Sequence, residues 1–144
     1  MANNIWLEFG DGQYLAHLKN KRIDEVETKC GADLGDIYAR TMTGVYRDAD
    51  GEWLIMPTEA RWKNAELVEI VREAFIGGGK AIIDGETKVI ESYQVNRILQ
   101  SYLEDRPRVE LWKLAAAILH VTMEGRETGE QEGVETPQPP EKTD

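Results

Sequence analysis

The sequence predicts an α+β fold in which helices dominate, with an N-terminal β-hairpin packed on about five helices and a disordered C-terminal tail. Three observations carry this prediction. Apolar side chains alternate with other residues from Ile5 to Phe9 and again up to Leu18, the period of two expected of strands. Between residues 20 and 123, apolar residues mostly recur at spacings of three and four, as on one face of a helix. The chain after residue 124 holds few hydrophobic side chains and many Glu, Gly and Pro residues, so it is unable to form a core.

The length and composition are those of one domain. A chain of 144 residues is long enough to bury about two-thirds of the surface that its unfolded form exposes. We therefore assign a single globular domain to residues 1–124 and a disordered acidic tail to residues 125–144.

The first half of the chain is predicted to hold two hairpins with two short helices between them. Asp11-Gly12 favours the tight turn of the first hairpin, since both central positions of the commonest two-residue turn need positive φ. Asn20 and Asp33 are suitable N-cap residues for two short helices, each of which a glycine ends. Residues 45–53 contain two β-prone runs around an Asp/Gly-rich turn, so they predict a second hairpin or an exposed loop.

An amphipathic helix within residues 66–80 runs directly into three consecutive glycines, Gly77, Gly78 and Gly79. Glycine is common just past a helix, because the left-handed conformation that satisfies the last carbonyls carries no side-chain penalty there. We interpret the three glycines as a helix stop and as a flexible joint between two helical halves.

The second half is predicted to be helical. Residues 81–84 form a brief apolar link, Asp84-Gly85 forms a turn, and a helix covers residues 88–105. Arg106-Pro107 then predicts a corner, because proline disfavours helix in the residue before it and suits the first turn of the next helix.

The final helix, over residues 107–123, is the most apolar segment of the chain, and Trp112 is its largest side chain. A helix that is apolar nearly all round is buried on several sides. We expect it to be the innermost helix, with Arg106, Pro107 and Trp112 joining the three glycines in one structural hinge.

Composition also bounds the location of the protein. No apolar run approaches the ~20 residues that a bilayer requires, and the N-terminus lacks the features of a signal peptide. We expect a soluble cytoplasmic protein without membrane contact. The net charge of −10, from 17 basic and 27 acidic residues, disfavours binding to nucleic acid.

Searches for catalytic or cofactor motifs give negative results. Lys80 follows the glycines, but a phosphate-binding loop also requires a preceding strand and a Ser or Thr after the lysine. The acidic turn around Gly51 lacks carboxylates at the first and last positions of a calcium loop. The carboxylate pair of Glu69 and Glu73 lies on what we expect to be solvated helix surface. With one cysteine and two histidines there is no triad or metal cage, so we predict no enzyme, no cofactor and no metal.

Tryptophan is the one unusual feature of the composition. Trp6, Trp53 and Trp62 lie in or near predicted strands and loops, where exposed aromatic residues often anchor partners. We name these three as candidate partner-binding residues. The alternative, that they cover the ends of the core, is equally open.

Several segments in order resemble the tail assembly chaperone family of tailed phages and gene transfer agents. These are DGQYLAHL, VETKCGADLGDIYAR, VREAFIGGGK and DRPRVELWKLAAAIL, so the resemblance spans residues 5–125. The combination of the glycine helix end with Arg106-Pro107, Trp112 and the alanine-rich helix is its most specific part.

The resemblance implies a non-enzymatic viral tail assembly protein that is absent from the mature particle. Such a chaperone binds the tail tape measure protein, keeps its long hydrophobic helices soluble, and helps the tail tube protein to polymerise. An alternative is a structural tail tube or minor tail protein retained in the particle. An enzyme or nucleotide-binding module is a third, supported only by the glycines and Lys80. A homo-oligomer remains open.

Overall fold

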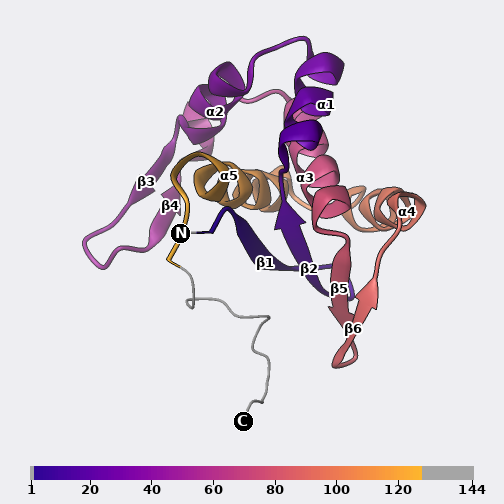
Figure 1. The fold of residues 1–144 in the computed structure, drawn as a ribbon. Coiled ribbons are helices and arrows are strands. Elements are labelled where there is room, and N and C mark those ends of the chain that lie inside the picture. The colour runs from indigo at the N-terminus through magenta and orange to yellow at the C-terminus, as the bar shows by residue number, and fades with distance from the viewer. Residues whose placement is uncertain (1, 128–144) are drawn as a thin grey trace.

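The structure is a computed structural model that describes residues 2–127. Helices lie over one side of a four-stranded sheet, and a separate two-stranded hairpin extends from the other end of the molecule (Figure 1). The elements in chain order are β1 (Asn4–Phe9), β2 (Gly12–His17), α1 (Asn20–Cys30), α2 (Leu34–Met42), β3 (Val45–Arg47), β4 (Trp53–Ile55), a 3-10 turn η1 (Pro57–Glu59), α3 (Asn64–Gly78), β5 (Lys80–Ile83), β6 (Glu86–Val89), α4 (Ser92–Leu103) and α5 (Arg108–Glu124). The predicted α+β class, with helices dominant and an N-terminal hairpin on five helices, is confirmed.

The larger sheet is antiparallel throughout, in the order β1-β2-β5-β6. Its helix-covered face carries buried side chains such as Tyr14, Ala16 and Ala81, as period-two alternation requires. The N-terminal hairpin is confirmed, but its turn lies one residue earlier than predicted. Phe9 pairs with Gly12, and Gly10 supplies the positive φ of 59° at the first turn position.

The three glycines lie where α3 meets β2 and β5. Gly79 is the left-handed cap, with φ 65°, and its N–H donates to the carbonyl of Phe75 at 3.0 Å. Gly77 and Gly78 belong to the helix and lie against the β2 backbone. A Cβ at Gly78 would be only 1.9 Å from the carbonyl oxygen of Leu15. The predicted helix stop is confirmed, and the glycines lead into a strand and allow close packing on β2. Their role as a flexible joint stays a prediction.

The segment after the glycines is a β-hairpin, where the sequence predicted a link and an early helix start. Asp84-Gly85 forms the predicted turn, with φ values of 53° and 79°. Residues 86–89 then pair with β5, and α4 begins only at Ser92. The side chain of Gln94 accepts a hydrogen bond from the N–H of Glu91 at 2.8 Å, which fixes this later start.

The predicted corner at Arg106-Pro107 is confirmed, since α4 ends at Leu103 and α5 begins at Arg108. Helix α5 lies against α2, α3 and both strands of the N-terminal hairpin, and Trp112 is fully buried within it. It shares the centre with α3, which contacts β2, α1, α4 and α5. Helices α3 and α5 therefore form the centre of the core together.

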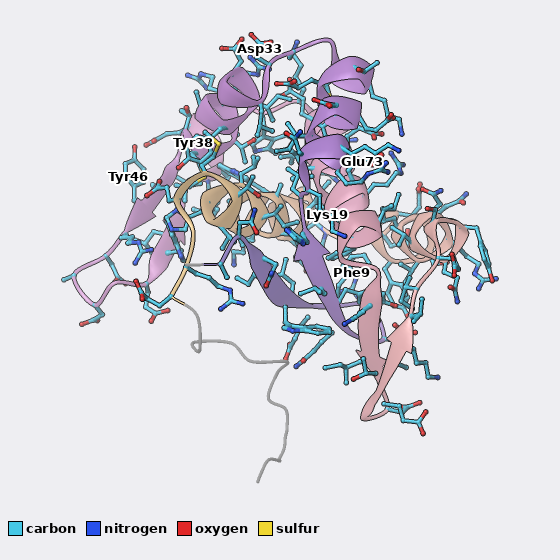
Figure 2. The ribbon with its side chains drawn as sticks, viewed as in Figure 1. Phe9, Lys19, Asp33, Tyr38, Tyr46 and Glu73 are labelled. Atoms are coloured by element: carbon cyan, nitrogen blue, oxygen red, sulfur yellow. The ribbon has the colours of Figure 1, made fainter. Side chains whose placement is uncertain are left out.

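The carboxylates of α3 contradict the prediction of a solvated helix surface. Glu66 is 2% and Glu73 is 1% exposed. Glu73 lies between α1 and α3 (Figure 2) and accepts hydrogen bonds from Arg22 at 3.0 Å and Lys29 at 3.1 Å. Glu66 is paired with Arg40 of α2. The α1–α2 corner is thus attached to α3 partly by buried ion pairs, which local sequence periodicity does not reveal.

The folded part extends slightly beyond the predicted boundary at residue 124. Ala2 and Arg126 exchange backbone hydrogen bonds of 2.9 and 2.8 Å, and the Arg126 guanidinium also donates to the backbone carbonyl of Asn4. The two ends of the described chain are therefore held together. The remainder of the predicted disordered tail lies outside the described residues.

Candidate protein-interaction surface

The β3–β4 hairpin is built from residues that are apolar on both of its faces. The register pairs Val45 with Ile55 and Arg47 with Trp53 on one face, and Tyr46 with Leu54 on the other. A strand covered on one side only normally alternates apolar and polar residues. The continuous run from Trp53 to Met56 breaks that alternation. One face of this hairpin therefore presents apolar side chains to solvent.

The outer face of the hairpin, formed by Tyr46, Leu54 and Met56, is the exposed one. Tyr46 is 50%, Leu54 47% and Met56 43% exposed. Tyr46 extends from β3 away from α5 (Figure 2), and its hydroxyl donates to the carboxylate of Glu59. This hydrogen bond raises the pKa of Tyr46 above its ordinary value. Three neighbouring exposed apolar side chains on a protruding element are typical of a contact surface for another macromolecule.

The inner face of the hairpin covers a pocket against α5. The pocket has a volume of about 310 Å³ and is mainly apolar. Its floor comes from α5, its roof from the inner face of the hairpin, and its polar rim from three side chains. The floor includes Ala116, Ala117 and Val121, the roof includes Val45 and Ile55, and the rim consists of Glu52, Lys113 and His120. Tyr46, Leu54 and Met56 do not line the pocket, so the pocket and the outer face lie on opposite faces of the hairpin.

Trp53 closes the pocket on the side of the hairpin. Its ring meets His120 of α5 edge-on, with ring centroids 5.1 Å apart. The guanidinium of Arg47 lies 4.1 Å from the Trp53 ring centroid, a cation–π contact. Trp53 is 45% exposed, so its indole is available at the mouth of the pocket.

The base of the hairpin is fixed to the core by Trp112. The indole Nε1 of Trp112 donates to the backbone carbonyl of Thr41 at 2.7 Å, just before the hairpin begins. Gly44 lies directly against the same indole, since a Cβ there would meet the ring at 3.1 Å. The ring of Trp62, in the segment that follows the hairpin and η1, packs on Trp112 with centroids 5.8 Å apart. Trp112 therefore positions the surface without being part of it.

The structure does not bring the three predicted partner-binding tryptophans together. Trp53 lines the pocket, whereas Trp62 is half-buried against the core. Trp6 lies in β1, half-buried and opposite Leu15 in the register, on the sheet face away from the helices. Only Trp53 belongs to the surface described above, and the binding role of all three stays a prediction.

The six predicted hinge residues also lie in two separate places. Gly77 and Gly78 pack against β2, and Gly79 caps α3, as described above. Arg106 and Pro107 form the corner between α4 and α5, where Arg106 is paired with Glu110 at 3.3 Å. Trp112 lies one turn further along α5 and supports the β3–β4 hairpin. These residues organise packing at distinct points, and their mechanical role as one hinge stays a prediction.

Sequence reasoning missed Tyr46, Leu54 and Met56 as candidate contact residues. The signal was present, because the four consecutive apolar residues of β4 and the position after it place two side chains on the side away from the core. Locating that side required the pairing of β3 with β4 and the position of α5.

Among residues 2–127 there is no group of three or more potential metal-ligating side chains, and Cys30 lies away from the pocket, with its thiol pKa raised mainly by burial. None of the helices within the described range is long and apolar enough to cross a membrane.

Comparison with protein families gives a match over most of the chain. The family described as "Phage tail tube protein, GTA-gp10" matches residues 3–125 of this chain, which is nearly all of the described fold. Comparison with curated proteins and comparison with solved structures each gave no match. The predicted resemblance to a phage and gene transfer agent tail family is confirmed, and the match supports a role in phage tails.

Proposed function

The chain belongs to the phage tail tube protein (GTA-gp10) family, and we propose that it is a structural, non-enzymatic tail protein carried in the particle. In this proposal it is joined to neighbouring tail proteins through the outer face of the β3–β4 hairpin and the adjoining pocket. The description of the family favours this structural role over the chaperone role.

The observation that carries the proposal is the outer face itself. Tyr46, Leu54 and Met56 leave a contiguous apolar area on a protruding hairpin whose base is fixed by Trp112. Preorganised aromatic and aliphatic anchors on a rigid support are the usual centre of a protein–protein contact, because little side-chain entropy is lost when they bind.

A tail assembly chaperone is the second candidate, and strand length favours it. The longest strands have six residues, and helices dominate the described chain. The apolar outer face beside an acidic body would suit transient cover for hydrophobic helices of a tape measure protein, while the net charge of −10 opposes aggregation. In this case the protein would act in the host cytoplasm and leave before the particle is complete.

Quantitative mass spectrometry of purified particles separates the two candidates. A structural protein is expected at a fixed copy number per particle, comparable with other tail proteins. Absence from particles, together with recovery of a soluble complex when the protein is coexpressed with the tape measure protein, would overturn the structural proposal in favour of the chaperone.

The contact surface has its own test. Leu54→Ser should block tail formation or partner capture while changing the free energy of unfolding by no more than about 0.5 kcal/mol, since Leu54 is 47% exposed. Tyr93→Ser is the matched control, because Tyr93 is also exposed but lies in α4, away from the hairpin and outside β6. Normal tails with the Leu54 variant would contradict the proposed surface.

A further inference from the structure

The outer edge of β6 is an uncovered strand edge with a self-complementary charge pattern. Strand β6 ends the four-stranded sheet, and all four of its residues are exposed. Within the described part of the chain, β5 is the sole strand that pairs with it. An uncovered edge offers backbone donors and acceptors to a further strand.

The β5–β6 register shows which backbone groups are free. Residues on either side of a two-residue turn form a hydrogen-bonded pair, here Ile83 with Glu86, and such pairs recur at every second position. The series of hydrogen-bonded pairs continues past the end of the strand to Gly79 and Ile90, where the N–H of Ile90 donates to the carbonyl of Gly79 at 2.9 Å. The N–H and C=O groups of Thr87 and Val89 therefore point away from β5, along the open edge.

We propose that this edge pairs with the same edge of a second copy of the chain, in an antiparallel arrangement centred on Thr87. The two Thr87 residues would exchange two backbone hydrogen bonds across a two-fold axis. Glu86 of each copy would then lie opposite Lys88 of the other, so both charges on the strand meet an opposite charge. The result is one continuous eight-stranded sheet.

The charge order selects this register over its neighbour. Shifting the axis to Lys88 would place the two lysines directly opposite each other, which is unfavourable. A lysine on an edge strand usually discourages edge pairing, but here Glu86, two residues earlier, lies where the partner's lysine arrives. The Thr87-centred register also places Val89, which is 72% exposed, beside the Asp84-Gly85 turn of the second copy and partly covers it.

The contact is small, because β6 has four residues. A patch of this size belongs to weak or transient interfaces, so we expect association at high protein concentration or where neighbouring copies are held close together. The inference does not depend on whether the protein is a tube component or a chaperone.

Charge reversal tests the register directly. Sedimentation equilibrium of the wild type should show a monomer–dimer equilibrium. Glu86→Lys and Lys88→Glu, made separately, each place like charges opposite one another and should weaken the dimer by about 10-fold or more. The double variant Glu86→Lys/Lys88→Glu restores the complementarity and should dimerise about as well as the wild type.

Mixing the two single variants gives an independent readout. One chain then carries two acidic and the other two basic residues on β6, so the mixture should form heterodimers although neither variant dimerises alone. Thr87→Pro serves as a fold control, because it removes an N–H that β5 does not use; it should be monomeric with an unchanged circular dichroism spectrum. A monomeric wild type at all concentrations, or a double variant as weak as the single ones, would overturn the inference.

Discussion

The four-stranded sheet and the β3–β4 hairpin differ in how their apolar side chains are covered. In the sheet, Tyr14, Ala16 and Ala81 face the helices, and α3 approaches so closely that two of its residues must be glycine. The hairpin has apolar residues on both faces and a helix on one side only. The apolar side chains on the helix-covered face of the sheet are buried, whereas those on the outer face of the hairpin are exposed.

This difference means that the α3–β2 contact mainly stabilises the fold, whereas the hairpin is available to bind a partner. Close packing of α3 on β2 allows no change in volume, because protein interiors are as dense as organic crystals. The outer face of the hairpin contributes little to the core and is available to a partner. The same residue type illustrates the contrast, since Trp112 is fully buried and holds a hydrogen bond, whereas Trp53 is exposed at the mouth of the pocket.

The largest effect is expected at the contact between α3 and β2. In Gly78→Val the new Cβ would lie 1.9 Å from the carbonyl oxygen of Leu15, so the helix or the strand must move. We expect a loss of more than about 4 kcal/mol in the free energy of unfolding, measured by chemical denaturation. The matched control is Gly35→Val in α2, where nothing lies within 4 Å of the added Cβ, and where we expect a change of no more than about 0.5 kcal/mol. Equal effects at both sites would contradict the packing role of the glycines.

A smaller effect is expected where the hairpin joins the core. Trp112→Phe removes the hydrogen bond to the Thr41 carbonyl and leaves a void beside Gly44, so we expect a loss of about 3 kcal/mol. Hydrogen exchange should become faster in β3 and β4 than in β1 and β2, because the lost contacts hold the hairpin. Trp53→Phe, at an exposed position, should cost less than about 1 kcal/mol. Faster exchange confined to the larger sheet would show that the hairpin is held in another way.

The smallest of the three effects concerns the ion pairs that attach α1 to Glu73 of α3. Glu73→Gln leaves Arg22 and Lys29 without their shared carboxylate, and we expect a loss of about 2 kcal/mol by thermal or chemical denaturation. Glu110→Gln is the control, since its pair with Arg106 is exposed and should contribute less than about 0.5 kcal/mol. Equal losses from the two variants would mean that burial of Glu73 adds nothing to its pairing.

The sequence by itself determined the elements whose signals are local. The period of two in residues 5–9, the Asp84-Gly85 turn, the corner at Arg106-Pro107 and the apolar final helix all depend on neighbours a few residues apart, and each prediction is confirmed. The family resemblance likewise followed from short motifs in order, and residues 3–125 match a phage tail family.

Only the tertiary structure decided what depends on distant segments. The amphipathic pattern of α3 does not tell that α1 and α2 bring Arg22, Lys29 and Arg40 onto its carboxylates. Three glycines do not by themselves distinguish a joint from a close contact with a strand more than 60 residues away in sequence. Nor does the apolar run at residues 53–56 tell which side of its hairpin α5 will leave uncovered. Burial and charge pairing depend on which distant segments pack together in the folded chain. A local sequence pattern does not identify those segments.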